Sequence, residues 1–225
     1  MSKIQLYTAK KTKSSALSSG KLYIIIASVV CLGLLSSTDP VLAHHALSGK
    51  VPSNFFEGFI SGLAHPVIGL DHFAFVVAIG LLSIGQQNSF LIPAAFVLTA
   101  MTGTGIHVLN YDLPFPEIII AFSVVAFGVM LLLSRKPNWL VLAGLGAIAG
   151  LFHGYAYGES IVGAQMTPLI AYLAGFSVIQ YVVAIGALLI GTAISNKFSG
   201  IKMLRFAGLA IAAIGTVFLT TAIIG

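Results

Sequence analysis

The chain is poor in charged residues. Only 8% of its 225 residues are Asp, Glu, Lys or Arg, whereas 58% are hydrophobic, and the mean hydropathy is +1.03. A soluble domain carries about 25% charged residues. The 11 basic and 6 acidic side chains are too few to cover a water-facing surface. The composition therefore excludes an ordinary soluble protein and predicts an integral membrane protein.

The chain has a single cysteine, Cys31, and it lies in a segment typical of a secretory signal peptide. An apolar stretch, LYIIIASVVCLGLLS, is followed by STDPVLA, in which Val41 and Ala43 occupy the small-residue positions before a cleavage site. Five lysines precede or begin this stretch: Lys3, Lys10, Lys11, Lys13 and Lys21. We predict a cleaved signal peptide over 1–43 and a mature domain over 44–225; an uncleaved first helix is the alternative. The mature chain then lacks cysteine, which excludes disulfides and thiolate ligands.

Most of the positive charge belongs to this leader. Cleavage leaves six basic and five acidic residues, a net charge of +1 instead of +5. The mature chain therefore gives no indication of nucleic-acid binding. It also has no P-loop, so direct coupling to ATP within this chain is not expected.

Long apolar runs recur after the leader. A helix needs about 20 apolar residues to cross a membrane, and six such runs follow: Ser61–Gly85, Phe90–Leu109, Pro114–Ser134, Asn138–Tyr157, Thr167–Ser195 and Met203–Ile224. The predicted fold class is all-α, a polytopic membrane helix bundle with six transmembrane helices after the signal peptide.

The basic residues indicate the orientation of these spans, because cytoplasmic loops collect Lys and Arg. They fall between spans three and four and between spans five and six: Arg135, Lys136, Lys197, Lys202 and Arg205. We therefore predict a multi-pass protein of the bacterial inner membrane. The mature N-terminus and the C-terminus are both expected on the outer, periplasmic side.

Ionisable side chains inside a membrane are costly and are typical of functional sites. With the predicted orientation, those of this chain fall in the outer half of the membrane or at its outer surface: His65, Asp71, His72, His107, His153 and Glu159. Imidazole and carboxylate ligands without thiolate suit nickel, cobalt or zinc. Copper(I) would favour clustered methionines, and the four of the mature chain are scattered.

The first span holds the densest polar group, in GLAHPVIGLDH. His65 and His72 are seven residues apart, so they share one face of a continuous helix. Pro66 is able to kink or break that helix. Asp71 is a candidate ligand or a group that orients a histidine.

The fourth span partly repeats this pattern. GFISGLAHPVIGLD (58–71) and GAIAGLFHGYAYGE (146–159) both read Gly-x-x-x-Gly-Leu-x-His, with an acid six residues after the histidine. Because the two spans run in opposite directions, the similarity predicts an inverted repeat of three plus three spans. Chance similarity between helices rich in glycine and alanine is the alternative.

Three further histidines have open roles. His107 ends the second span, either as an interface residue or as an inward ligand. Cleavage would make His44 and His45 the first two residues, where a free amine beside two imidazoles is able to capture a metal ion. A polar mobile tail is the alternative for this pair.

The segment HPVIGLDHFAFVVAIGLLS resembles the His-Pro-x-x-Gly-x-Asp-His motif of the HupE/UreJ family of metal permeases. The signal peptide, the six spans and FHGYAYGE in the fourth span are also similar to that family. The resemblance implies secondary uptake of nickel, or of cobalt in some members. By the motif match it implies that His65, Asp71 and His72 are functional residues. It implies the same for His153 and Glu159. The family often has a second histidine where this chain has Tyr157, so the resemblance does not decide which metal is transported.

The leading hypothesis is a permease, not an enzyme, that imports Ni²⁺ or Co²⁺ as substrate and holds no tightly bound cofactor. Its expected surroundings are membrane lipid, and association of several copies of the chain is left open. The alternative is a membrane-embedded zinc hydrolase in which the His/Asp group activates water. A third hypothesis is a structural helper in a larger membrane complex.

Overall fold

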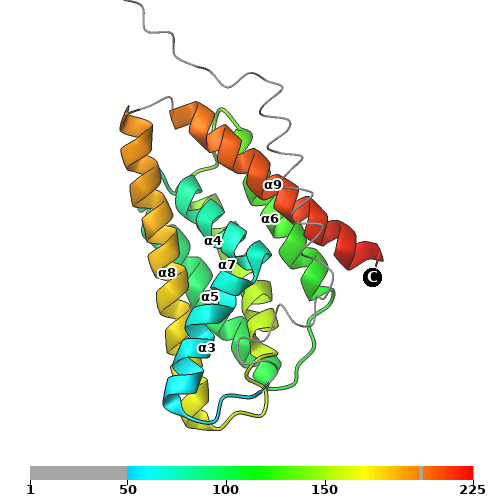
Figure 1. Ribbon diagram of the computed structural model, residues 1–225. Coiled ribbons are helices and arrows are strands. Elements are labelled where there is room, and N and C mark those ends of the chain that lie inside the picture. The colour runs from blue at the N-terminus through cyan, green and yellow to red at the C-terminus, as the bar shows by residue number, and fades with distance from the viewer. Residues whose placement is uncertain (1–49, 198–199, 225) are drawn as a thin grey trace, which may run out of the picture.

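The chain folds as a bundle of α-helices. The computed structural model describes residues 50–197 and 200–224, and within these ranges there are seven helices and no strand (Figure 1). Their bounds are α3 (Phe55–Ile68), α4 (Leu70–Leu82), α5 (Leu91–Val108), α6 (Pro116–Leu132), α7 (Trp139–Gly158), α8 (Met166–Lys197) and α9 (Gly200–Ile224). The all-α prediction is confirmed. The predicted signal peptide over 1–43, His44 and His45 lie outside the described residues.

Several of these helices are long and apolar enough to cross a membrane. The helices α5, α7, α8 and α9 each meet that requirement, and α3 with α4 forms a fifth span if the bent pair counts as one. The helix α6 is apolar but has only 17 residues. A membrane helix bundle is thus supported, while the count of six spans stays a prediction.

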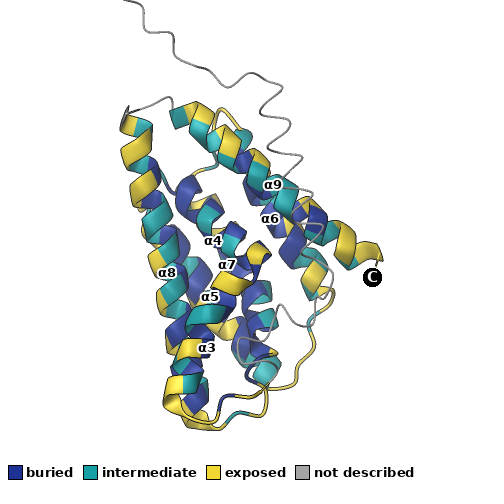
Figure 2. Ribbon diagram, viewed as in Figure 1, coloured by how far each residue is buried: buried dark blue, intermediate teal, exposed yellow. Residues whose placement is uncertain are grey.

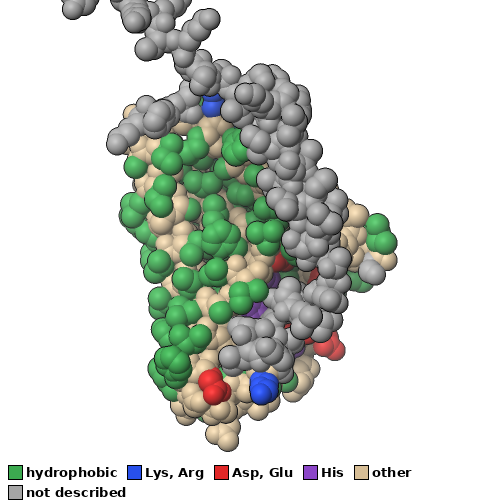
Figure 3. Space-filling view, viewed as in Figure 1, with side chains coloured by type: hydrophobic (Ala, Val, Ile, Leu, Met, Phe, Trp, Pro, Cys, Tyr) green, Lys and Arg blue, Asp and Glu red, His purple; other side chains and the backbone are tan. Residues whose placement is uncertain are grey.

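The outer surface of the bundle is apolar. Phe122, Leu140 and Val182 are about three-fifths exposed, at 60%, 61% and 58%. Figure 3 shows hydrophobic side chains spread over the face formed by α8 and α3. Exposed side chains of this kind are stable against lipid tails and costly against water.

The first predicted span is not one continuous helix. It ends as α3 at Ile68 and resumes as α4 at Leu70, and the two axes are bent by 79°. Pro66 lies inside α3 and removes one helical donor, whereas the break itself is at Gly69, with φ −70° and ψ 102°. The prediction that His65 and His72 share one face of a continuous helix is therefore wrong.

The helix α3 also begins earlier than predicted, at Phe55 instead of Ser61. The Asn54 side chain accepts a hydrogen bond from the Glu57 backbone N–H at 3.0 Å. The Glu57 carboxylate in turn accepts from the backbone and hydroxyl of Ser53, both at 2.8 Å. These hydrogen bonds cap the start of the helix and give Glu57 a structural role.

Glycines allow close packing between helices that are distant in sequence. A Cβ at Gly62 of α3 would collide with the Tyr172 carbonyl of α8, and one at Gly154 of α7 would collide with the Ala100 carbonyl of α5. Such close backbone approach is typical of membrane helix pairs. Exchange of the two halves would map the α3–α8 pair onto the α7–α5 pair. This is the correspondence that an inverted repeat requires.

Candidate metal site

Three histidines from separate helices meet in the interior of the bundle. His65 of α3, His72 of α4 and His153 of α7 are 2%, 1% and 0% exposed. Figure 2 shows the buried stretches of the helices in dark blue, turned towards the interior of the bundle. The Nδ1 atoms of His72 and His153 are 2.8 Å apart. The ring centres of His65 and His72 are 6.0 Å apart. The tertiary fold therefore joins residues that are up to 88 positions apart in sequence into one polar group.

The break at Gly69 is what lets His65 and His72 approach each other from two helices. The Gly69 N–H donates to the His65 carbonyl at 3.1 Å, which closes the end of α3. A Cβ at Gly69 would lie 2.7 Å from Cδ2 of His72 and 3.4 Å from Oδ1 of Asp71. Only glycine leaves room at this position for the imidazole and the carboxylate as they stand.

Tyr157 lies against the two histidines. Its ring centre is 5.0 Å from that of His65 and 4.6 Å from that of His72, and its side chain is fully buried. Its hydroxyl donates to Oε1 of Gln180 at 3.4 Å. The phenol therefore supplies an aromatic wall to the site, with its hydroxyl bonded to Gln180 of α8.

The contacts of His65 indicate which of its nitrogens carries a proton. The Tyr172 hydroxyl lies 3.1 Å from Nδ1 of His65 and donates its single proton to the Tyr157 carbonyl at 2.9 Å. The Tyr172 oxygen is then only an acceptor towards His65. The Tyr172 contact favours a proton on Nδ1 of His65, which would leave the Nε2 lone pair for a metal ion. Ser160 Oγ lies 2.9 Å from the same Nδ1.

Asp71 brings a carboxylate into the same region. Asp71 is 6% exposed, and its Oδ1 is buried without a hydrogen-bond partner among the described residues. The side chains of Asp71 and His72 both lie beside Gly69. A buried carboxylate is unfavourable unless it is paired with a cation or protonated. The donor chemistry of Asp71 therefore suits a site that takes up a cation.

The group is not a finished coordination shell. Among the described residues, no three His, Asp, Glu or Cys side chains are arranged as a ready-made metal site. With metal–nitrogen bonds of about 2.0–2.1 Å, the ring centres of two imidazoles on one ion lie up to about 6.4 Å apart. The 6.0 Å between His65 and His72 is within that reach.

Comparison with known proteins shows the family of the chain. The family model for HupE / UreJ protein matches residues 32–218, most of the chain. The chain belongs to the HupE/UreJ family. Protein HupE of Rhizobium leguminosarum bv. viciae is 33% identical over 135 residues, which cover 58% of this chain and 70% of that protein. No solved structure matches the chain significantly. HupE/UreJ is a family of membrane transporter type.

One histidine and one acidic candidate of this HupE/UreJ chain make none of the contacts that join the buried group. His107 is half-buried at the end of α5, where its Nδ1 contacts the Tyr155 carbonyl at 2.8 Å and its ring lies 4.3 Å from the Tyr155 ring. Glu159 is exposed at the C-terminal cap of α7. The structure thus brings together His65, His72 and His153 but neither of these two.

Sequence reasoning missed two serines that contact the histidines. Ser160 follows α7 and contacts His65, as described above. Ser123 of α6 lies 3.0 Å from Nε2 of His153 and is buried. The sequence could have pointed to Ser123, because it is the single polar residue of α6 after Glu117.

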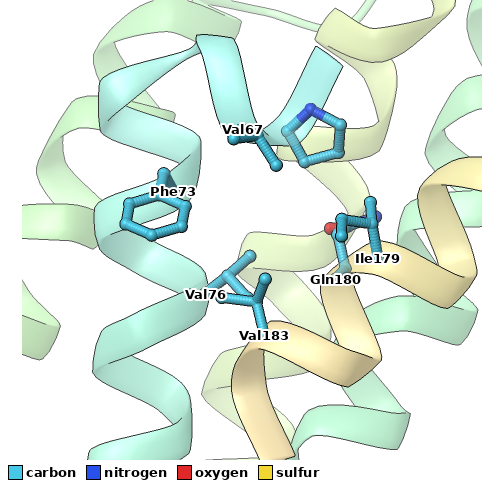
Figure 4. A pocket seen from close by; sticks show the side chains of 7 residues that line it. Val67, Phe73, Val76, Ile179, Gln180 and Val183 are labelled. Carbon is cyan, nitrogen blue, oxygen red and sulfur yellow. The ribbon is translucent and has the colours of Figure 1, made fainter. Parts of the chain in front are cut away.

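The bend between α3 and α4 also borders a shallow depression that has no room for an enclosed water molecule. Figure 4 shows that its lining is apolar apart from Gln180: Pro66, Val67, Phe73, Val76, Ile179 and Val183. It holds no candidate ligand. It therefore belongs to the packing of α8 against the break and not to the histidine group.

Proposed function

We propose that this protein is a secondary permease that imports Ni²⁺ or Co²⁺ across the bacterial inner membrane. The observation that carries the proposal is the buried group of His65, His72 and His153 beside the Asp71 carboxylate. Ionisable side chains inside an apolar membrane bundle are costly and are typical of ion pathways and other functional sites. Because the chain belongs to a family of transporter type, transport of a metal ion best explains why these costly side chains lie inside the bundle.

The distribution of charge at the two ends of the bundle supports an inward direction. Arg205 near the start of α9 donates to Ser134 after α6 at 3.3 Å, so the two basic connections lie at one end. Asp112 and Glu159 lie beyond the ends of α5 and α7, at the other end of the bundle in Figure 1. With basic loops in the cytoplasm, the acidic end faces outward and attracts cations towards the histidine group.

Transport requires that the ion be bound weakly enough to leave. A structural zinc site holds its metal in four fixed ligands, whereas a conducting site must release the ion on the other side. The three histidines are held by Tyr172, Ser160, Ser123 and one another. An incoming ion has to replace part of this network, which favours brief occupation.

Uptake into proteoliposomes tests the proposal. The full chain, reconstituted in lipid vesicles, is expected to take up ⁶³Ni or ⁵⁷Co with saturation, and His72→Ala is expected to lower uptake at low ion concentration about tenfold or more. Ser83→Ala serves as the matched control, because Ser83 is fully buried in the same region of the chain but donates only to the Ile79 carbonyl. Equal uptake by the native chain and His72→Ala would refute the proposal.

The same preparation separates the two alternatives. A zinc hydrolase predicts one tightly held zinc ion per chain after dialysis against chelator, and no net ion movement. A structural helper predicts that neither His65→Ala nor Asp71→Asn changes metal accumulation. A permease predicts loss of uptake in both variants with no stoichiometric metal after dialysis.

A further inference from the structure

A chain of hydrogen bonds connects the histidine group to α6. Nδ1 of His72 is 2.8 Å from Nδ1 of His153, and Nε2 of His153 is 3.0 Å from the Ser123 hydroxyl. The Ser123 hydroxyl is 2.6 Å from the Ile120 carbonyl, one turn earlier in α6. Three helices, α4, α7 and α6, are thus joined through two imidazoles and one hydroxyl.

The carbonyl at the end of this chain of hydrogen bonds fixes the direction of every bond in it. A carbonyl oxygen only accepts, so the single Ser123 proton is donated to Ile120. The Ser123 oxygen then accepts, and Nε2 of His153 must carry the proton that lies between them. In a neutral imidazole the other nitrogen is unprotonated, so Nδ1 of His153 accepts from Nδ1–H of His72.

We propose that Ser123 is a positioning residue that sets the tautomer of His153 and so presents the Nδ1 lone pair of that histidine to the transported cation. This inference rests on the proposed function for the identity of the cation. Metal-ligating histidines are generally held in one tautomer by a hydrogen bond to the other ring nitrogen. Ser123 supplies that bond from α6, a helix that carries none of the candidate ligands.

The packing around His153 leaves the ring little freedom to reach another acceptor. Its ring centre is 4.5 Å from that of Phe75 and 5.7 Å from that of Phe96, and all three side chains are fully buried. No other polar group is recorded at Nε2 among the described residues. The orientation of His153 is therefore enforced by aromatic contact, and its tautomer by Ser123.

The arrangement also accounts for reversible binding. In the structure, the Nδ1 lone pair of His153 is engaged by the N–H of His72. A cation arriving from the His65 side competes with that N–H for the same lone pair. The hydrogen bond re-forms when the cation leaves, so the site returns to one defined metal-free state.

Nitrogen-15 NMR of the full chain tests the tautomer directly. Histidine-labelled protein in metal-free lipid bilayers at about pH 8 is expected to show His153 protonated at Nε2, with its signals assigned by their loss in His153→Asn. A net hydrogen bond biases such an equilibrium by roughly 2- to 13-fold. Ser123→Ala is therefore expected to give a mixture of the two tautomers, while Ser123→Thr, which keeps the hydroxyl, and Ser83→Ala retain the native spectrum.

Uptake of ⁶³Ni by the same variants tests the consequence. Ser123→Ala is expected to raise the concentration for half-maximal uptake about tenfold with the maximal rate changed less than about twofold, and Ser123→Thr is expected to restore it. A His153 that is protonated at Nδ1 in the native chain, or a Ser123→Ala variant with native half-saturation, overturns the inference. If the native chain moves neither nickel nor cobalt, the proposed permease function is what fails, and the metal-free spectrum still decides whether Ser123 sets the tautomer.

Discussion

Substitution of Gly69 by alanine is expected to displace His72, one of the proposed ligands, without harming the fold. Gly69 has φ −70° and ψ 102°, a conformation that alanine adopts freely. The added Cβ would lie 2.7 Å from Cδ2 of His72. Carbon atoms in contact lie about 3.5–4.0 Å apart, so the imidazole has to move by about 0.8 Å or more.

A displacement of this size matters for a metal ligand. Coordination distances are held to within about 0.2 Å of their preferred values. We therefore expect Gly69→Ala to raise the half-saturation concentration for ⁶³Ni uptake roughly 10- to 100-fold, the range found when the support of a ligand is lost. The fraction of protein inserted in the membrane and its thermal unfolding temperature are expected to stay near native.

Gly144→Ala is the matched control for this experiment. Gly144 lies in α7 with no atom within 4 Å of an added Cβ, so the same chemical change meets open space there. It is expected to leave uptake unchanged and to stabilise the helix slightly. Native half-saturation in Gly69→Ala would mean that His72 does not ligate the ion at the position the structure gives it, and the reasoning would be wrong.

Three further predictions concern the surroundings of the site. Tyr172→Phe removes one of the two hydroxyl oxygens at Nδ1 of His65 and is expected to raise the half-saturation for ⁶³Ni roughly 2- to 13-fold; an unchanged value would show that the Ser160 contact is enough to hold the tautomer of His65. Gly154→Ala drives a methyl group into the Ala100 carbonyl and is expected to destabilise the protein by about 1–3 kcal/mol, seen as a lower thermal unfolding temperature. His107→Gln is expected to change half-saturation less than about threefold, because His107 contacts Tyr155 and none of the buried histidines; a tenfold change would place it on the ion path.

Hydrophobic length decided most of the helix bounds, and these could be predicted from the sequence. The run Phe90–Leu109 forms α5 over Leu91–Val108, and the run Asn138–Tyr157 forms α7 over Trp139–Gly158. A helix in lipid must satisfy its own backbone groups, so long apolar runs have few alternatives to a helix. The candidate ligands His65, His72 and His153 were likewise visible as rare ionisable residues in such runs.

The break in the first span was harder to place. Pro66 pointed to a disrupted helix, but the chain stays helical through Ile68 because a proline within a helix removes only one bond and leaves the following turn intact. The break falls at Gly69, where the missing side chain makes room for His72. That requirement is set by a contact in three dimensions, and no local pattern in the sequence states it.

The same limit applies to Ser123. Its contact with His153 joins residues 30 positions apart on two helices, and its spacing from the histidines follows no periodic rule. A lone serine in an apolar helix more often bonds to its own backbone, as Ser123 also does with Ile120. Only the packing of α6 against α7 shows that the hydroxyl has a second partner.

The aromatic residues beside the histidine group impose a condition on any passage of ions. Phe75 lies 4.5 Å from His153 and 4.5 Å from Phe127, ring centre to ring centre, and all are buried. A cation does not cross a close-packed aromatic cluster, because nothing there replaces its hydration shell. Phe75 and His72 are three residues apart on α4, and α4 is joined to α3 only through the extended Gly69. Any displacement of α4 that moves Phe75 out of this cluster would also part the His72–His153 contact, because Phe75 and His72 lie one turn apart on the same helix.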